Sequence, residues 1–258
     1  MSETLDERKR ELRDEFIEAR GYWSELWTSL LELDPDFFEA YLRFSSVPWR
    51  SGPLDPKTKE LVYIAMNAAA THMYEPGVRQ HVRQALAHGA TAAEIMEVLE
   101  LTATLGIHAC TVGVPILVEE LEAAGQPLLR ELSARMQEVK ADFERKRGYW
   151  NAFWDEMLIL DPEFFAAYTQ FSGVPWVSGV LEPKVKELIY TAFDVAATHL
   201  YTPGLRQHIR NALGYGASRE EVMEVIELVS VLGIHACTVG VPILLEELAA
   251  TPVAEPGA

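Results

Sequence analysis

The chain has 258 residues, of which 49% are hydrophobic and 24% charged, a balance typical of globular rather than disordered proteins. Its formal net charge of −17 argues against nucleic acid as a partner, because a phosphate backbone attracts clustered Lys and Arg. We find no apolar run long enough to span a membrane, and the N-terminal sequence MSETLDERKRELRDE lacks the apolar core of a secretion signal. We therefore expect a cytoplasmic protein without a membrane partner.

The sequence consists of one unit written twice, at an offset of 127 residues (208 − 81). RGYW at 20–23 recurs at 147–150, and GIHACTVGVPIL at 106–117 recurs unchanged at 233–244. Self-similarity of this kind predicts two domains that arose by duplication, residues 1–126 and residues 127–258.

Every element predicted in the first unit is a helix. Apolar residues between Leu12 and Leu30 recur at three- and four-residue steps, which predicts one long amphipathic helix. Asp34-Pro35 is typical of an N-cap followed by proline at the first helical position, and Asp55-Pro56 repeats the signal. The helix that starts there is predicted to run to about Met73.

Pro76 begins the next helix, and Gly89 ends it in the manner of a C-terminal glycine. Thr91 with Glu94 is a capping box for the following helix, as is Ser218 with Glu221 in the second unit. Gly106 then breaks the chain before a last helix. No alternating strand pattern is present, so the predicted fold is all-α, with residues 252–258 as a frayed tail.

Two copies of a histidine-rich turn, THMYEPGVRQH at 71–81 and THLYTPGLRQH at 198–208, carry the candidate chemistry. His72 is predicted in the last turn of one helix and His81 in the second turn of the next, so a sharp hairpin would bring them together. Arg79 and Arg83 lie near a helix N-terminus, which attracts anions such as a substrate carboxylate. The second copy repeats this arrangement with His199, His208, Arg206 and Arg210.

Simpler roles are open for several of these residues. His72 and His199 could cap a helix or pack in the interior, and the arginines could be solvated charges. His108 and His235 stand in the apolar sequence GIHAC and are predicted to be core residues. Cys110 and Cys237 are predicted to be small core hydrophobes.

The run LDPKTKELVYIAMNAAATHMYEPGVRQHVRQALAHGATAAEIMEVLELTATLGIHA resembles the carboxymuconolactone decarboxylase family, which includes alkylhydroperoxidase D. The shared features are the K-E-L opening, the H-V-R-x-A-L-x-x-G-A-T segment, A-E-I-x-E-V-L and a closing helix that contains glycine. The resemblance covers residues 54–117 and 181–244. It implies an all-α fold whose subunits interlock their helices in trimers or hexamers.

In the redox branch of this family, a CxxC motif and a histidine four residues later form the active site with an upstream glutamate. The resemblance places His81 and His208 at that histidine. The two cysteine positions fall at Tyr74 and Gly77, and at Tyr201 and Gly204 in the second unit. Without a thiolate and its resolving partner the dithiol peroxidase cycle cannot run, and the two tyrosines become candidate substrate contacts.

Glu60 and Glu187 are candidates for the upstream glutamate, although the separation from Glu60 to His81 is 21 residues, two more than in the redox branch. One straight helix from Glu60 to His72 would be about 18 Å long. We therefore expect Glu60 to reach His81 across a bend or from another repeat or subunit. The alternative carboxylates are Glu97 and, in the second unit, Glu224.

The non-redox branch implies a lyase without a cofactor, which decarboxylates a small carboxylated lactone or a related intermediate of aromatic catabolism. His81 and His208 would exchange protons as acid–base residues, and His72 and His199 would assist. Two alternatives are a binding protein without catalysis and a metal site. The candidate metal ligands, whose spacing matches no standard motif, are His72, His81, His108, His199, His208 and His235.

The duplication also bears on assembly. If two single-unit relatives form a two-fold pair, one fused chain would contain that pair, and three chains would rebuild a six-unit ring. The predicted partner is therefore the chain itself, in a homotrimer with pseudo-hexameric symmetry.

Overall fold

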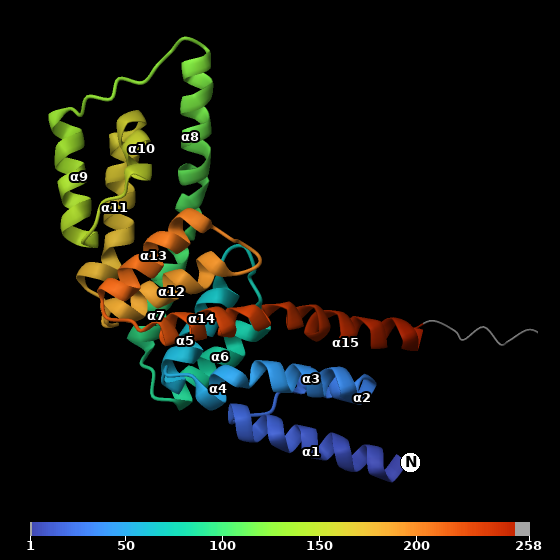
Figure 1. Ribbon diagram of the computed structural model, residues 1–258. Helices are drawn as coiled ribbons and strands as arrows, with labels where there is room; N and C mark the ends of the chain where they lie inside the picture. Colours follow the sequence, from blue (N-terminus) through green and yellow to red (C-terminus); the bar gives the residue numbers. More distant parts are fainter. Residues whose placement is uncertain (1, 251–258) are drawn as a thin grey trace, which may run out of the picture.

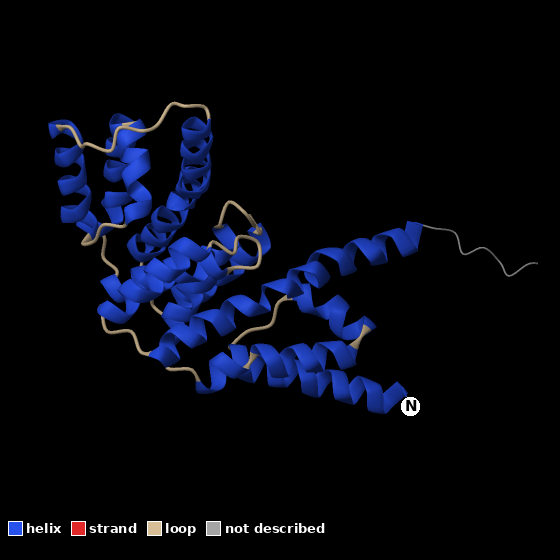
Figure 2. Ribbon diagram, turned by 45° about the horizontal axis from the view of Figure 1, so that its top comes forward, coloured by secondary structure: helices blue, strands red, loops and turns tan. Residues whose placement is uncertain are grey.

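The computed structural model describes residues 2–250, and within this range the chain forms helices, turns and loops with no β-strand (Figure 2). The predicted all-α fold is confirmed. The tail predicted at residues 252–258 lies outside the described range.

The helices of the two units correspond in order, except that α11 of the second unit spans the positions of both α3 and α4. The first unit contains α1 (Ser2–Arg20), α2 (Thr28–Leu33), α3 (Pro35–Ser45), α4 (Val47–Ser51), α5 (Pro56–Ala68), α6 (Glu75–Ala87), α7 (Ala92–Ala103) and α8 (His108–Ala123). The second contains α9 (Ala134–Arg147), α10 (Asp155–Leu160), α11 (Pro162–Val177), α12 (Pro183–Val195), α13 (Thr202–Gly214), α14 (Arg219–Ser230) and α15 (His235–Ala250). Short 3₁₀ turns precede α2, α8, α10 and α15.

Local signals set the helix starts as predicted. The Asp34 side chain accepts a hydrogen bond from the Phe37 N–H at the start of α3. Both capping boxes are formed, by Thr91 with Glu94 at α7 and by Ser218 with Glu221 at α14. These contacts satisfy N–H groups that would otherwise lack partners in the first turn.

Two predicted helices are shorter than their apolar patterns suggested. Gly21, at φ = +78°, ends α1 and splits the predicted long helix, because only glycine adopts this left-handed conformation without a steric cost. Helix α5 ends at Ala68 rather than near Met73, and Met73 itself has φ = +50°. His72 therefore lies in a tight turn between α5 and α6, not in a helix.

The central layer contains α5–α7 and α12–α14, and two arms project from it (Figure 1). One arm combines α1–α4 with α15, and the other combines α9–α11 with α8 (Figure 1). Each unit thus sends its last helix to pack against the first helices of the other unit. The predicted boundary between residues 126 and 127 separates the two sequence repeats. In the fold, however, the two repeats pack together through their exchanged helices.

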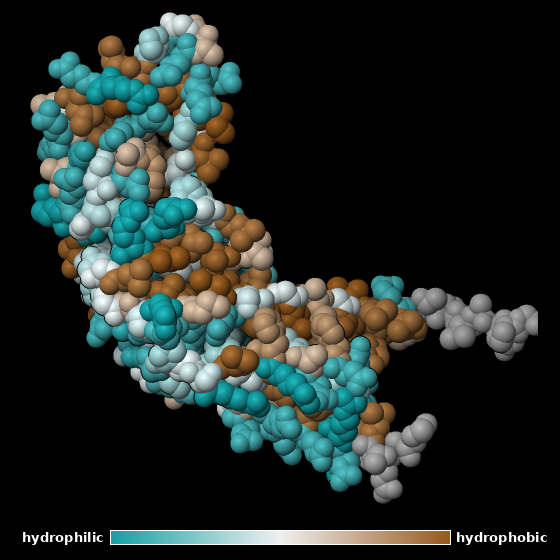
Figure 3. Space-filling view, in the orientation of Figure 1, coloured by the Kyte–Doolittle hydropathy of each residue, from teal (hydrophilic) through white to brown (hydrophobic). Residues whose placement is uncertain are grey.

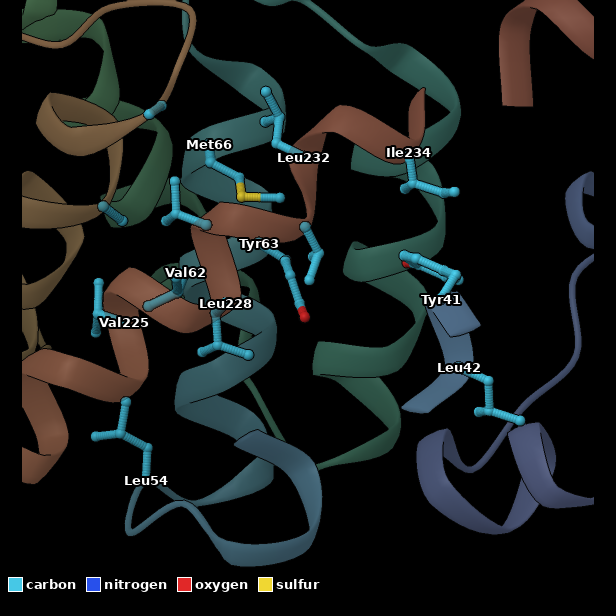
Figure 4. Close-up of a cluster of buried hydrophobic side chains, with 14 of the residues drawn as sticks. Tyr41, Leu42, Leu54, Val62, Tyr63, Met66, Val225, Leu228, Leu232 and Ile234 are labelled. Atoms are coloured by element: carbon cyan, nitrogen blue, oxygen red, sulfur yellow. The ribbon is translucent and has the colours of Figure 1, made fainter. Parts of the chain in front are cut away.

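The largest hydrophobic core shows this joining directly. Leu42 of α3 and Tyr63 of α5 belong to the same buried cluster as Val225 and Leu228 of α14 (Figure 4). All four are less than 2% exposed. Burial of such side chains stabilises the fold by about 1.5–3 kcal/mol each relative to exposure, so the arm that contains α3 depends on apolar surface from both units.

Buried ion pairs reinforce the contact between the units. Glu224 on α14 lies 2.8 Å from Lys59 on α5 and accepts a hydrogen bond from the Leu54 N–H. Glu97 on α7 makes the corresponding ion pair with Lys186, also at 2.8 Å. The sequence-based alternative that Glu97 or Glu224 assists a histidine is therefore wrong, because both carboxylates are committed to the opposite unit.

Two segments, Ala92–Ala123 and Arg219–Ala250, are long and apolar enough to cross a membrane by length and composition. This contradicts our expectation that no apolar run reaches such a length. In the fold each segment is a pair of helices joined by a 3₁₀ turn, α7–α8 and α14–α15. Val98 and Leu101 of α7 lie in a buried core, which accounts for part of the apolar character.

We predict that Glu224→Ala lowers the free energy of unfolding by about 3–5 kcal/mol, because it leaves the Lys59 ammonium buried without its counter-ion. Urea denaturation followed by circular dichroism measures the change. The control is Glu75→Ala, which breaks the exposed Glu75–Arg79 pair on α6 and should cost no more than about 1 kcal/mol. Equal effects of the two changes would contradict the assigned role of Glu224.

Candidate functional site

A buried histidine–glutamate pair forms the centre of the first site. His81 on α6 places its Nδ1 2.6 Å from Oε2 of Glu60 on α5, and Glu60 is fully buried. The two helices pack against each other within one repeat, so the carboxylate reaches the histidine across the hairpin. The His81 ring also stacks on Tyr63, with ring centroids 4.4 Å apart.

The second site repeats this geometry. His208 Nδ1 lies 2.6 Å from Glu187 Oε2, and the imidazole stacks on Tyr190 at 4.4 Å. A carboxylate on Nδ1 fixes the tautomer, so that Nε2 is the nitrogen left for chemistry. Among residues 2–250, no hydrogen bond engages Nε2 of either histidine.

A pair of histidines closes each site, and each pair joins the two units. His72 Nε2 lies 2.7 Å from Nδ1 of His235 at the start of α15. His199 and His108 make the same contact at 2.6 Å in the second site. The prediction that His108 and His235 are core residues is wrong, because both are only half-buried and each pairs with a histidine of the opposite unit.

The two candidate tyrosines lie beside these histidine pairs. Tyr74 stacks on His235 with centroids 4.0 Å apart, and its hydroxyl is 2.6 Å from Oγ1 of Thr238. Tyr201 contacts His108 and Thr111 in the same way. The structure thus brings His72, His81 and Tyr74 of the first unit close to His235 and Thr238 on α15 of the second unit.

The four arginines predicted to bind substrate do not reach either site. Arg79, Arg83, Arg206 and Arg210 are all exposed. On a helix a residue two positions from the inward-facing histidine points about 200° away from it. Arg79 instead pairs with Glu75 on the outer surface of α6.

Two other arginines, which the sequence-based prediction missed, lie at the sites. Arg20 ends α1 and Arg147 ends α9, and they are 4% and 2% exposed. The Arg147 guanidinium lies 5.2 Å from the ring centroid of Tyr190 and 5.3 Å from that of Trp176. Neither guanidinium has a salt bridge within the described part of the chain, and Nε of each lacks a hydrogen-bond partner there.

Arg20 and Arg147 are the first residues of the RGYW motif, which is identical in both units and was the feature of the sequence that could have indicated them. Nothing local in that motif distinguishes a buried cation from a helix-terminal charge. Burial of an arginine without an anion is unfavourable, so the position favours a ligand that brings a negative charge.

A narrow cavity connects these groups in the second site. Its lining includes Arg147 and Tyr168 from the arm, Tyr190 and His208 from the central layer, and His108 from α8. The cavity volume is about 20 Å³, enough for about one water molecule. A larger ligand has to displace side chains of the arm. Burial raises the pKa of Tyr168 to about 12, so its hydroxyl stays protonated and can donate to an anion.

The positions that carry cysteine in the redox branch are structural here. A Cβ at Gly77 would lie 2.3 Å from Oδ1 of Asn67, and one at Gly204 would lie 2.4 Å from Oδ2 of Asp194. Both contacts are too short, so glycine allows the turn to approach the preceding helix. Cys110 and Cys237 are free thiols that are half-buried and pack against the edges of hydrophobic cores, rather than within them as predicted.

The candidate metal ligands divide between the two sites rather than forming one group. His72 pairs with His235, whereas His108 pairs with His199, so His72, His81 and His108 do not converge. His81 and His208 each commit Nδ1 to a glutamate. One other combination, His108, Asp194 and His199, does bring three ligand atoms within 4.8 Å of one another.

Comparison with known proteins agrees with this duplicated architecture. The model of the carboxymuconolactone decarboxylase family matches residues 35–117 and again residues 162–244. The chain belongs to the carboxymuconolactone decarboxylase family. A search of curated proteins gives no match.

Among solved structures, one that matches this family member is a 1.70 Å crystal structure from Burkholderia xenovorans LB400. That protein is provisionally assigned as a gamma-carboxymuconolactone decarboxylase subunit. The two chains are 51% identical and superpose with a TM-score of 0.92. The match covers 95% of this chain and 98% of the other, so the similarity includes the arms as well as the family core.

Proposed function

We propose that the chain is a carboxy-lyase that decarboxylates a small carboxylated lactone, or a related intermediate of aromatic catabolism, by histidine acid–base chemistry. The observation that carries this proposal is the combination of a glutamate-held imidazole and an unpaired guanidinium at one buried site. Such a site suits decarboxylation. The guanidinium can bind an anionic substrate, and the imidazole can supply the proton that replaces the lost carboxylate.

The proposed reaction uses the residues in a fixed order. The guanidinium of Arg20 or Arg147 binds a substrate carboxylate through paired N–H donors. The carbon–carbon bond to the departing carboxylate breaks as CO₂, and its electron pair delocalises towards the lactone carbonyl. In the doubly protonated form of the ring, whose charge the glutamate on Nδ1 stabilises, Nε2–H of His81 or His208 then donates its proton to the carbon, and a proton from solvent restores the ring.

The glutamate has a positioning role in this scheme. Glu60 or Glu187 accepts a hydrogen bond from Nδ1–H, which orients the ring with Nε2 towards the substrate and stabilises the positive charge of the ring when Nε2 also carries a proton. His72 and His199 contact the sites through their hydrogen-bonded partners His235 and His108, and we propose that they assist the proton exchange. The chemistry of this scheme is carried by side chains and requires no redox cofactor.

We also propose a cytoplasmic location and a homotrimer. Apolar surface gathers around α12–α14 and along α15, and also at the outer edge of α8 (Figure 3). It includes exposed apolar residues on α8 and α15, among them Val112, Ile116, Leu117, Val239, Ile243, Leu244 and Leu248. Exposed apolar surface along extended helices is typical of protein–protein contacts, and three fused chains would close a six-unit ring.

We predict that the double variant His81→Ala/His208→Ala lowers kcat by at least about 100-fold, because general acid–base catalysis contributes about 10²–10⁴. Turnover is measured by release of CO₂ from a panel of carboxylated lactones. The single variants apportion the activity between the sites. Full turnover by a folded double variant would refute the assignment, and ligand-induced thermal shifts without any product would favour a binding protein instead.

We predict that Arg20→Met/Arg147→Met raises KM by about 10- to 100-fold, the loss expected when one charged hydrogen-bonding contact is removed. Methionine preserves most of the buried volume, and circular dichroism checks folding. The matched control is Arg79→Met/Arg206→Met, which removes two exposed arginines and should leave KM unchanged. An unchanged KM in the first variant, or a raised KM in the control, would contradict the proposed carboxylate contact.

We predict a particle of three chains, about 87 kDa from a chain mass of 28.9 kDa, in light scattering at micromolar concentration, where a closed symmetric assembly should persist. Replacement of Ile116 and Ile243 by lysine should lower the mass, because charge opposes burial of the apolar faces. A monomeric mass for the unmodified chain would refute the assembly.

A further inference from the structure

One of the buried differences between the two sites exchanges an amide for a carboxyl. Asn67 near the end of α5 corresponds to Asp194 near the end of α12, at the same offset of 127 residues (194 − 67). Both side chains are fully buried. Around them the histidine pairs match, at 2.7 Å between His72 and His235 and 2.6 Å between His199 and His108.

Asn67 is neutral and makes one hydrogen bond, although its Oδ1 is buried without a partner in the described residues, whereas an ionised Asp194 would bury a charge with no hydrogen bond at all. The Asn67 amide donates through Nδ2 to the Tyr63 carbonyl at 2.8 Å, a bond that a carboxylate cannot make. Within the described residues, neither carboxylate oxygen of Asp194 has a hydrogen-bond partner. Oδ1 lies 3.8 Å from His108 Nδ1, and Oδ2 lies 4.0 Å from His208 Nε2. These separations are too long for hydrogen bonds.

We propose that the second site binds one divalent cation of the Zn²⁺ class, held by His108 Nδ1, His199 Nε2 and a carboxylate oxygen of Asp194. One ligand atom of each residue lies within 4.8 Å of the other two, and His108 Nδ1 itself is 2.6 Å from His199 Nε2 and 3.8 Å from Asp194 Oδ1. One ion with bonds of about 2.0–2.2 Å can reach all three residues after small side-chain rotations. Two imidazoles and a carboxylate are a ligand set that suits such an ion. The first site, with the neutral Asn67 amide, does not bind one.

Cation binding requires a rearrangement of protons. The hydrogen between His108 Nδ1 and His199 Nε2 moves to the outer nitrogen of its own ring, so that both inner lone pairs face the ion. The carboxylate of Asp194 binds in its ionised form and any proton that it carries is released to water. The groups that face this carboxylate are His108, His208 and, at longer range, Glu187.

The place of the cation beside His208 has a functional consequence. His108 lines the cavity of the second site together with His208 and Arg147. A three-ligand site leaves a coordination position open to water or a substrate oxygen. The two sites of one chain therefore differ in charge and in the oxygen-bearing ligands that they bind. This inference does not depend on the proposed decarboxylation, because metal binding is measured without turnover.

The test titrates Co²⁺ into the tag-free full-length protein after treatment with a chelator, and follows the visible absorption of bound cobalt and its stoichiometry. About one ion per chain is expected, as one complete ligand set is present. The variant Asp194→Asn, which copies the first site, should fold normally by circular dichroism and lose the signal. Asn67→Asp completes the ligand set in the first site and should raise the stoichiometry to about two.

Several results would overturn the inference. These are no bound cobalt or two ions per chain in the unmodified protein, a signal that survives in Asp194→Asn, and a folded Asn67→Asp variant that still binds one ion. Elemental analysis of the unmodified protein and the two variants after zinc loading provides an independent readout.

Discussion

The exchange of terminal helices between the two units is the constraint on which the sites depend. Helix α15 of the second unit carries His235 to the site of His81, and α8 carries His108 to the site of His208. Neither repeat holds a complete site by itself. The buried Glu224–Lys59 and Glu97–Lys186 pairs lie at this same interface, so the contacts that join the units also fix the distance between the groups of each site.

Local features of the fold could be predicted from the sequence, because their causes lie within a few residues. The capping residues Asp34 and Thr91 and the Asp55-Pro56 start depend only on neighbouring backbone groups. The break at Gly21 was missed because an apolar pattern continues across it, while the glycine decides the backbone conformation. The pairing of His81 with Glu60 was among the possibilities, since both belong to one helical hairpin.

Features that depend on distant contacts could not be read in this way. GIHAC gives His108 an apolar setting in the sequence, but the crossing of α8 places that ring against His199, 91 residues away. Arg79 has a suitable sequence position near a helix start, yet the helical period turns it outward. Arg20 resembles an ordinary helix-terminal charge, and only the packing of α1 against α3 and α4 shows that it is buried, with its guanidinium over the rings of Trp49 and Tyr63.

Fusion of two units into one chain permits a difference that an assembly of identical single units cannot have. In a pair of identical chains, a change of Asn to Asp near the end of the helix that carries the glutamate would occur in both sites at once. In the fused chain residue 194 is Asp while residue 67 is Asn, although the surrounding histidines, tyrosines, glutamates and arginines are matched. The fused chain thereby avoids the cost of a second buried carboxylate without a partner.

Burial, followed by the Glu187 charge, raises the pKa of Asp194 to about 9, so this carboxyl is held protonated near neutral pH unless a cation stabilises its charge. The duplicated scaffold is therefore suited to two related but unequal sites, in which one keeps a neutral amide and the other a carboxyl that responds to a ligand.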